Sequence, residues 1–315
     1  MFFLFQLRFG IKASSEGGLS YHFYEKSCPQ VEDIVKDGLE AVFLMDPTSP
    51  AALLRLMFHD CQVQGCDASI LVDSREGSEM ASSKNFGIRK RELISMLKSI
   101  VEAQCPQQVS CSDIIILAAR EAVALTGGPR IKVPLGRKDS TRTPSYEFAD
   151  QLLPPATTGV ANMLNIFAKK GMTLPESVAI LGAHTLGVTH CSSIQNRLYS
   201  PQNGELSVME PSFAAFLRLS CPQGPLTSNL SFVVNDPTSF VFDNAYYVSA
   251  MEGRGVLKID AEMVLDPETA RVMQRFAVNQ DDFFREFSSA FVKLSCSGVL
   301  TGEQGVIRKN CNAIN

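Results

Sequence analysis

Two side chains four residues apart, Arg55 and His59, suggest acid–base chemistry. They stand at the end of the apolar run 51–58, and on a helix this spacing places both on one face, one turn apart. Burying a guanidinium and an imidazole in an apolar wall is costly unless they serve a purpose. Together they can transfer a proton and stabilise a developing negative charge. The pattern therefore predicts a catalytic pair on a helix.

Oxygen-bearing side chains follow directly after this pair. Asp60 and Asp67 enclose a short loop in which Cys61 and Cys66 are five residues apart. Carboxylate and carbonyl oxygens are the ligands that Ca²⁺ prefers. The loop therefore indicates a site for a hard cation, and the alternative is a polar loop without a bound ion.

A second histidine, His184, lies among small residues in the stretch 181–187, as a flat cofactor close to the backbone requires. A lone histidine on an apolar helix is usually a hydrogen-bonded core residue, and we interpret His22 and His190 in that way. We expect His190, six positions on, to lie on a different side of the same helix. A ligating histidine needs a partner for its other ring nitrogen, and Asp260 is the candidate, with a helix cap as its alternative role.

The composition bounds the class of protein. A chain of 315 residues can bury a large core, as one domain or as two lobes. Apolar residues make up 45% and charged residues 20%, which is ordinary for a globular protein. A formal net charge of −4 gives no reason to expect a nucleic-acid partner, and no apolar run is long enough for a membrane span.

Nine cysteines are scattered along the chain without a C-x-x-C pair. This pattern argues against a tetrahedral zinc site and fits disulfides formed in an oxidising compartment, with at least one thiol left over. We interpret residues 1–18 as a leader or an atypical, truncated signal region, because Gln6, Arg8 and Lys12 interrupt the apolar start. The cysteines therefore predict secretion more strongly than the leader does.

Helical periodicity dominates the elements that must position these residues, so the predicted fold class is mainly α. Ser110 or Ser112 is the expected cap of one helix, and the segment from Thr173 to Glu176 is a capping box before another. Strand signals are short, for example at 131–133. Helices are expected over 31–43, 91–101, 114–124 and 178–187, with an apolar stripe over 284–294.

Breaks rich in proline and glycine fall at 143–155 and 200–211. The first break separates a half that contains His59 from a half that contains His184. We therefore expect two lobes, about residues 19–150 and 151–315. A crevice between lobes is a usual location for a cofactor.

Over residues 19–315 the sequence resembles the secreted class III heme peroxidases of plants. The matching motifs keep the family's order and spacing, which chance matches would not do. They are F-Y-x-x-S-C-P at 23–29, R-L-x-F-H-D-C at 55–61, G-C-D-A-S at 65–69, V-S-C-S-D at 109–113, V-P-x-G-R-x-D at 133–139, G-A-H-T at 182–185, F-D-N-x-Y-Y at 242–247 and L-T-G at 300–302.

The resemblance implies a two-lobed heme peroxidase fold with one non-covalent heme b in the crevice between the lobes. His184 would be the ligand of the iron, and Asp260 the hydrogen-bonded partner of that imidazole. His59 would transfer the peroxide proton, and Arg55 would stabilise charge on the leaving oxygen. These four residues form the implied catalytic centre.

Two further positions receive roles from the same resemblance. Asn85 would accept a hydrogen bond from His59 and thereby fix its tautomer. An ungapped alignment of this divergent segment puts Lys84 at that position instead. Pro154 matches the proline at the entrance for reducing substrates.

The resemblance also implies two calcium sites. The distal site would combine side-chain and carbonyl oxygens of Asp60, Val63, Gly65, Asp67 and Ser69. The proximal site would combine those of Thr185, Asn235, Thr238, Val241 and Asp243. The family usually has aspartate where this chain has Asn235, so weaker calcium binding is expected there unless the neighbouring Asp236 takes its place.

Four disulfides are implied in the same way, and they leave Cys296 unpaired. Sequence alone does not select their connectivity. A loop closed by a disulfide between Cys61 and Cys66 favours a preformed calcium cage over a polar loop. Asp113 and Arg137 match a buried ion pair of the family. The implied disulfides are Cys28–Cys105, Cys61–Cys66, Cys111–Cys311 and Cys191–Cys221.

The expected function is that of a heme peroxidase. It reduces H₂O₂ and oxidises small phenolic donors by successive one-electron steps, in a cell-wall or oxidative-stress role. The chain is expected to be a monomer, secreted to the extracellular space, cell wall or vacuole. The alternative is a cell-wall protein that heme and calcium stabilise and that has little turnover. A zinc hydrolase is excluded, because the chain has no H-E-x-x-H motif or tight His/Cys cluster.

Overall fold

A computed structural model describes residues 18–74, 77–200, 209–224 and 231–314. The expected leader lies outside this range apart from Gly18. The described chain is mainly helical, which confirms the predicted fold class. Its one sheet pairs β1 (Val188–His190) with β2 (Phe232–Val234) in antiparallel orientation. Within these ranges, no helix is both long and apolar enough to cross a membrane.

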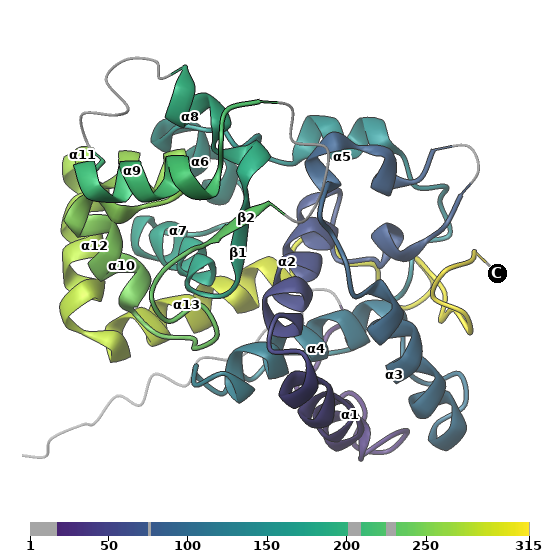
Figure 1. Ribbon diagram of the computed structural model, residues 1–315. Helices are drawn as coiled ribbons and strands as arrows, with labels where there is room; N and C mark the ends of the chain where they lie inside the picture. Colours follow the sequence, from purple (N-terminus) through teal and green to yellow (C-terminus); the bar gives the residue numbers. More distant parts are fainter. Residues whose placement is uncertain (1–17, 75–76, 201–208, 225–230, 315) are drawn as a thin grey trace, which may run out of the picture.

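The helices fall into two groups along the chain (Figure 1). In the first half they are α1 (Val31–Met45), α2 (Ser49–Gln62), η1 (Ser69–Leu71), η2 (Glu79–Ala81), η3 (Ser83–Asn85), α3 (Arg91–Gln104), α4 (Cys111–Leu125) and α5 (Tyr146–Leu152). In the second half they are α6 (Val160–Ala168), α7 (Leu174–Leu181), η4 (Gly182–Thr185), η5 (Cys191–Ser193), α8 (Gln195–Tyr199), α9 (Pro211–Ser220), α10 (Ala245–Ser249), η7 (Ala250–Arg254), α11 (Lys258–Leu265), α12 (Pro267–Val278) and α13 (Gln280–Ser295).

Figure 1 shows α1–α5 on one side and most helices of the second half on the other. Helix α13 runs from the second group toward α2, and it packs against both α7 and α2. The boundary of two lobes near residue 150 stays a prediction.

The local signals predicted several elements correctly. Helices form over the expected ranges in α1, α3 and α4. Ser110, not Ser112, caps α4, because its side chain accepts a hydrogen bond from Asp113 N. Thr173 and Glu176 form the expected capping box at the start of α7. Capping residues act over three positions, so a sequence motif is sufficient to find them.

Two expectations about elements were wrong. Residues 131–133 form no strand, and the first isolated bridge after them joins Leu135 to Ser20. The helix expected over 178–187 ends at Leu181 and continues as the 3₁₀ turn η4. Gly187, with φ of +89°, then redirects the chain into β1. His190 therefore ends a strand and does not share a helix with His184.

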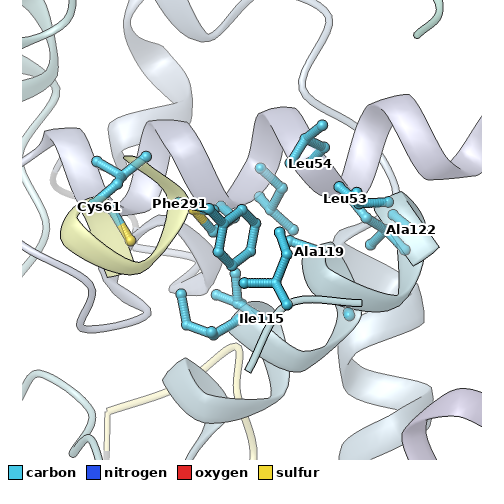
Figure 2. Close-up of a cluster of buried hydrophobic side chains, with 14 of the residues drawn as sticks. Leu53, Leu54, Cys61, Ile115, Ala119, Ala122 and Phe291 are labelled. Carbon is cyan, nitrogen blue, oxygen red and sulfur yellow. The ribbon is translucent and has the colours of Figure 1, made fainter. Parts of the chain in front are cut away.

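The core beneath the predicted catalytic pair is formed by three helices. Helix α2 packs on α4, and α13 contacts α2 (Figure 2). Leu53 and Leu54 of α2 lie beside Ile115 and Ala119 of α4 and Phe291 of α13, all of them buried. Each such side chain contributes about 1.5–3 kcal/mol when fully buried. This packing therefore fixes the orientation of α2, and with it the positions of Arg55 and His59.

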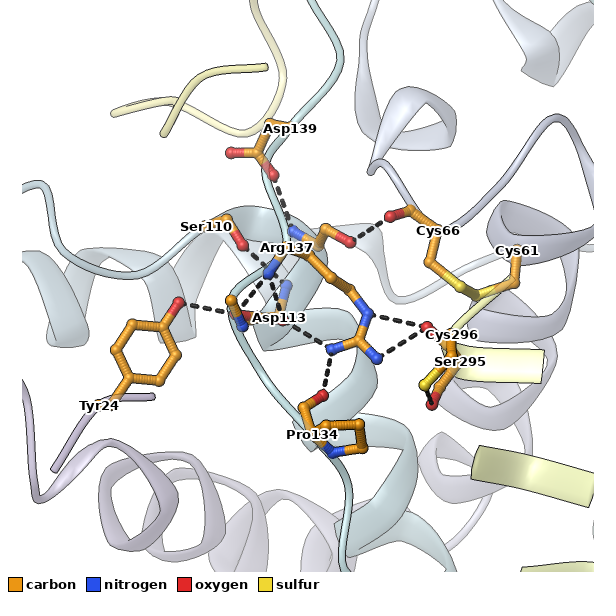
Figure 3. A network of polar contacts seen from close by, with 12 residues as sticks. Tyr24, Cys61, Cys66, Ser110, Asp113, Pro134, Arg137, Asp139, Ser295 and Cys296 are labelled. Carbon is orange, nitrogen blue, oxygen red and sulfur yellow. Dashed lines mark hydrogen bonds and ion pairs between the residues drawn. A yellow bond between two sulfur atoms is a disulfide. The ribbon is translucent and has the colours of Figure 1, made fainter. Parts of the chain in front are cut away.

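A buried ion pair joins three distant segments (Figure 3). Arg137 Nη1 donates to Asp113 Oδ1 at 2.8 Å, and both side chains are fully buried. The same guanidinium donates to the Ser295 carbonyl from Nε and Nη2, at 2.9 and 2.7 Å, and to the Pro134 carbonyl. Tyr24 donates to the other carboxylate oxygen of Asp113. The pair thus ties the start of α4 to the end of α13.

Disulfides add covalent links between segments that lie far apart in the sequence. The longest connection spans 200 residues and joins the start of α4 to the C-terminal segment. Cys296 is a free, half-buried thiol. The bonds present are the four pairs that the resemblance implies: Cys28–Cys105, Cys61–Cys66, Cys111–Cys311 and Cys191–Cys221.

Candidate functional site

Helix α2 brings the predicted acid–base pair together. Arg55 Nε donates to His59 Nε2 at 3.2 Å, as their spacing of four residues predicts. Arg55 Nη2 also donates to the Phe86 carbonyl at 3.0 Å, so the guanidinium is held from a second segment. Arg55 and His59 therefore form one hydrogen-bonded unit on α2.

The hydrogen bonds around His59 determine its tautomer. Because the Arg55 Nε group can only donate, His59 Nε2 must be the acceptor and the ring proton must lie on Nδ1. That Nδ1–H donates to Asn85 Oδ1 at 2.6 Å. Asn85 Nδ2 in turn donates to the Glu79 carbonyl at 2.8 Å, which fixes the amide orientation. His59 Nε2 is therefore the unprotonated ring nitrogen, and its lone pair accepts the hydrogen bond from Arg55.

The structure distinguishes the two candidates for the residue that orients His59. Asn85 is buried at the end of η3 and contacts the ring directly. The Lys84 ammonium points elsewhere and donates to the carbonyls of Asp150 and Leu153. The geometry therefore favours Asn85 over the ungapped alternative, Lys84.

Burial sets the charge state of the pair. Burial and, after it, the positive charge of Arg55 lower the pKa of His59 from 6.5 to about 3, while the hydrogen bond to Asn85 acts in the opposite direction. Burial also lowers the pKa of Arg55 to about 10. At neutral pH the imidazole is thus a neutral base beside a charged guanidinium.

The second histidine is held by a carboxylate. His184 Nδ1 donates to Asp260 Oδ1 at 3.0 Å. Asp260 also accepts hydrogen bonds from the Tyr246 hydroxyl at 2.7 Å and from Leu257 N at 3.1 Å. The His184 side chain is 30% exposed, whereas that of Asp260 is only 4% exposed. With Nδ1 used by Asp260, Nε2 is the ring nitrogen of His184 that is left to ligate a metal.

Tyr246 was missed as a functional residue, although it lies in a motif that the family resemblance uses. Its ring lies edge-on to His184, with centroids 5.9 Å apart. Burial, followed by the negative charge of Asp260, raises the pKa of its hydroxyl well above 10. The hydroxyl therefore stays protonated and donates to Asp260. The contact joins residues 14 positions apart, and no local spacing pattern reports it.

The segment that carries His184 passes directly beside α2. A Cβ at Gly187 would lie 2.6 Å from the Cβ of Ala51, one turn before Arg55. A Cβ at Gly182 would lie 2.4 Å from the ring of Phe283. Glycine is needed at both positions because the packing leaves no room for a side chain. The donor set of an open imidazole nitrogen with a carboxylate partner fits the iron of a heme.

The residues of the predicted distal calcium site lie in one loop after α2. Asp60 is fully buried, and its Oδ2 accepts from Ala68 N at 3.1 Å. Its Oδ1 has no hydrogen-bond partner in the described part of the chain. Burial raises the pKa of Asp60 well above its usual value, and the charges of Asp67 and Glu79 raise it further. A buried, unpaired carboxylate oxygen near two other carboxylates fits a cation.

The loop geometry around this oxygen depends on backbone contacts. Gly65, with φ of +139°, approaches the C-terminal segment so closely that a Cβ would lie 2.1 Å from the Gly298 carbonyl oxygen. Asp67 Oδ1 accepts from Ser69 N at 3.0 Å, and Val63 N donates to the His59 and Asp60 carbonyls. All five predicted distal ligands thus lie in the segment 60–69.

The predicted proximal calcium residues converge from two segments. Thr185 Oγ1 lies 2.7 Å from Asp236 Oδ2 and 3.3 Å from Asp243 Oδ1. Thr238 Oγ1 lies 3.0 Å from Asp243 Oδ1, and Val241 N donates to the Thr238 carbonyl. The described residues contain no group of three His, Cys, Asp or Glu side chains able to hold a metal. Hydroxyl and carbonyl oxygens would therefore have to complete an ion site here.

Asn235 needs a correction. Its side chain accepts from Thr189 Oγ1 at 2.7 Å and donates to the Leu186 carbonyl at 3.2 Å, on the side of β1. Asp236, not Asn235, directs its carboxylate to Thr185 and the other proximal residues. The chain bends at residues 235 and 236, directly after β2, and the two neighbouring side chains make separate sets of contacts. The expectation of weaker calcium binding depended on the loss of a carboxylate at Asn235. Since Asp236 brings a carboxylate to this site, that expectation no longer holds.

Pro154 lies just after α5, in a segment that is hydrogen-bonded to the first half of the chain. Gln62 Nε2, at the end of α2, donates to the Leu152 carbonyl at 3.0 Å. The Lys84 ammonium donates to the Leu153 carbonyl. Pro154 therefore stands close to the elements that hold His59, and its contact with a substrate stays a prediction.

Comparison with known proteins identifies the family. A family model described as peroxidase matches residues 31–279. Peroxidase 29 of Arabidopsis thaliana is 57% identical over 304 residues, which cover 95% of this chain and 89% of that protein. Peroxidase 28 of the same plant is 43% identical, with 94% and 93% covered, and Peroxidase 5 of Vitis vinifera is 39% identical, with 95% and 92% covered. The chain therefore belongs to the peroxidase family, within the class III group of plants.

Proposed function

We propose that this peroxidase binds one non-covalent heme b through His184 and oxidises small phenolic donors with H₂O₂. The family generally carries heme, and peroxide is the oxidant that its name implies. The observation that carries the proposal is the continuous set of contacts Arg55–His59–Asn85, with the open nitrogen of His184 on the neighbouring segment. When bound, the heme would supply the electrons that reduce the peroxide and then regain them from the donor.

His59 would manage the proton of the peroxide. Its Nε2 lone pair accepts a proton from one oxygen, and the imidazolium then returns that proton to the other oxygen as it leaves as water. The low pKa of His59 keeps this nitrogen unprotonated at neutral pH. Asn85 accepts a hydrogen bond from the other ring nitrogen, Nδ1, and thereby keeps the proton of the neutral ring there.

Arg55 would stabilise the charge that develops on the departing oxygen. Its guanidinium is held beside His59 by the Phe86 carbonyl, and its Nε–H would leave His59 Nε2 when peroxide binds between them. At the second histidine, Asp260 accepts a hydrogen bond from His184 Nδ1 and gives that imidazole more anionic character. Such a ligand favours oxidised iron.

Two Ca²⁺ ions are proposed as structural ions. The distal residues are Asp60, Val63, Gly65, Asp67 and Ser69, and the unpaired Oδ1 of Asp60 supports this assignment. For the proximal ion we propose the set Thr185, Asp236, Thr238, Val241 and Asp243. Each ion would offset carboxylates that the fold places close together.

Secretion and a monomeric state complete the proposal. The described chain contains four disulfides. Disulfides form in oxidising compartments and are rare in reducing ones. The extracellular space, the cell wall or the vacuole would provide such an environment. A heme- and calcium-stabilised cell-wall protein with little turnover is not favoured, because the relatives are peroxidases and the Arg55–His59 pair is intact.

The test is reconstitution of the protein with hemin and calcium under conditions that form disulfides. We expect a heme absorption band and guaiacol oxidation that depends on H₂O₂. A protein that binds heme but shows no peroxide-dependent oxidation would contradict the proposed turnover. A folded, oxidised protein that does not bind heme would contradict the assignment of His184.

A further inference from the structure

Two donors from different segments share one oxygen of Asp260, and the proposed function uses only one of them. His184, on η4, donates from Nδ1 to Oδ1 at 3.0 Å. Tyr246, on α10, donates from its hydroxyl to the same oxygen at 2.7 Å. The contact with Tyr246 is therefore the shorter of the two, and it falls on the atom through which Asp260 acts on His184.

The carboxylate of Asp260 is almost closed to solvent. Its side chain is 4% exposed, and Tyr246 is buried as well. Asp260 stands in the first turn of α11, where its Oδ2 accepts from Leu257 N at 3.1 Å. In a buried place with little water, each hydrogen bond acts strongly on the charge of the acceptor. The donors around Asp260 therefore decide how its negative charge is distributed.

Packing holds the Tyr246 ring in its orientation. The ring lies edge-on to that of His184, with 80° between the two planes. It also lies edge-on to the ring of Tyr247, with centroids 4.8 Å apart. Helix α10 itself packs against η4 and α12. A side chain enclosed in this way keeps its hydroxyl directed at Asp260.

The two donors compete for the charge of one oxygen. A hydrogen bond to a carboxylate stabilises its negative charge, so each further donor leaves less charge to attract the Nδ1 proton of His184. A weaker pull on that proton gives the imidazole less anionic character. An imidazole of this kind stabilises oxidised iron less. The hydroxyl of Tyr246 thus acts against the effect of Asp260.

We propose that Tyr246 is a positioning residue that acts on His184 through Asp260, and that its hydroxyl limits how strongly this imidazole stabilises oxidised iron. The carboxylate strengthens the ligand, and the hydroxyl moderates it. The inference rests on the proposed function, because it takes His184 as the ligand of the iron. It extends that function by assigning the strength of the ligand to a third residue.

The chain offers a matched control for the substitution Tyr246→Phe, which removes the hydroxyl and keeps the ring. Tyr247 is the next residue and is fully buried, but its hydroxyl donates to the carbonyls of Val178 and Ala179, at 3.1 and 3.3 Å. Tyr247→Phe therefore removes a buried hydroxyl that is bonded to the backbone of α7. The two variants together separate an effect on Asp260 from a general loss of packing or stability.

Two measurements on the heme-reconstituted protein report the strength of the ligand without turnover. They are the reduction potential of the iron, by equilibration with a redox dye, and the frequency of the iron–histidine stretching vibration, by resonance Raman spectroscopy. In Tyr246→Phe we expect the ferric–ferrous equilibrium to shift about fivefold toward ferric iron, the size of one net hydrogen bond. The vibration should move to a higher frequency. Tyr247→Phe should leave both measurements at their wild-type values.

A double-variant cycle tests whether Tyr246 acts through Asp260. In Asp260→Asn the side chain is neutral, so the hydroxyl has no carboxylate charge to share. Adding Tyr246→Phe to this variant should therefore shift the reduction potential much less than it does in the wild type. An equal shift in both backgrounds would mean that Tyr246 acts on the iron by another route, and the proposal would be wrong.

One further measurement does not require heme. The Nδ1 proton of His184 gives a nuclear magnetic resonance signal that moves downfield as its hydrogen bond becomes stronger. In the full chain with isotope-labelled histidine, before heme is added, Tyr246→Phe should move this signal downfield and Tyr247→Phe should not.

If the proton signal, the potential and the vibration in Tyr246→Phe all match those in Tyr247→Phe, the hydroxyl does not share the charge of Asp260 and the proposal is refuted. A folded wild-type protein that binds no heme would refute the proposed function instead. The proton signal would then still decide whether Tyr246 weakens the hydrogen bond between His184 and Asp260.

Discussion

His59 stands on a regular α-helix between two side chains, whereas His184 stands on a 3₁₀ turn against a carboxylate. Asn85 fixes the protonated nitrogen of His59, and burial with Arg55 keeps the ring neutral. At His184 the carboxylate of Asp260 makes the ring a stronger electron donor. The same side chain thus has the surroundings of a base in one place and those of a metal ligand in the other.

The two environments also differ in how the sequence encodes them. Arg55 and His59 are one helical turn apart, so local geometry brings them together. His184, Asp260 and Tyr246 meet only through the packing of η4, α10 and α11. The contrast predicts that substitutions in the two regions have separable effects.

The largest expected effect is that of His184→Ala. Removing the imidazole takes away the proposed bond to iron, so the heme absorption band should be lost after reconstitution. The measurement is the absorption spectrum at equal heme and protein, with circular dichroism as a control for folding. A folded variant with the normal heme band would reject His184 as the ligand.

His59→Leu should act on reactivity and leave heme binding intact. Loss of the base should slow the reaction with H₂O₂ by a factor on the order of 10²–10⁴. Stopped-flow absorption at the heme band measures this rate directly. Kinetics unchanged from those of the wild type would mean that His59 does not transfer the proton.

The proximal ion site gives a paired test of the correction at Asn235. Asp236→Asn removes a carboxylate that contacts Thr185, so calcium affinity should fall about tenfold or more. Asn235→Ala changes a side chain that bonds to Thr189 and should leave calcium affinity within about twofold. Calorimetric titration of the chelated protein measures both, and the reverse order of effects would restore Asn235 as the ligand.

A further effect concerns acid stability. The pKa of His59 is about 3 in the folded state, against an ordinary value of 6.5, so between these pH values the unfolded chain binds more protons. The free energy of unfolding therefore falls as pH falls through this window, by up to about 1.4 kcal/mol per pH unit from this group. Urea unfolding from pH 7 to pH 4 should show a steeper loss in the wild type than in His59→Leu. Equal slopes would mean that His59 is not held neutral by the fold.

Local patterns predicted the parts of this protein that depend on near neighbours in the sequence. The pairing of Arg55 with His59 and the capping box at Thr173 follow from helical periodicity and capping chemistry. The mainly helical class was predictable for the same reason. Family motifs then placed His184 and the disulfide pairs, although no physical argument from the sequence alone selects such pairs.

Only the tertiary structure decided which neighbours complete the site. It placed Asn85 rather than Lys84 on His59, Asp236 rather than Asn235 beside Thr185, and His190 next to Arg55. A shift of one residue in a loop reverses the direction of a side chain, and a sequence pattern does not report such a shift. Contacts between segments tens of residues apart are set by how helices and loops pack, which is why composition and spacing could not select these partners.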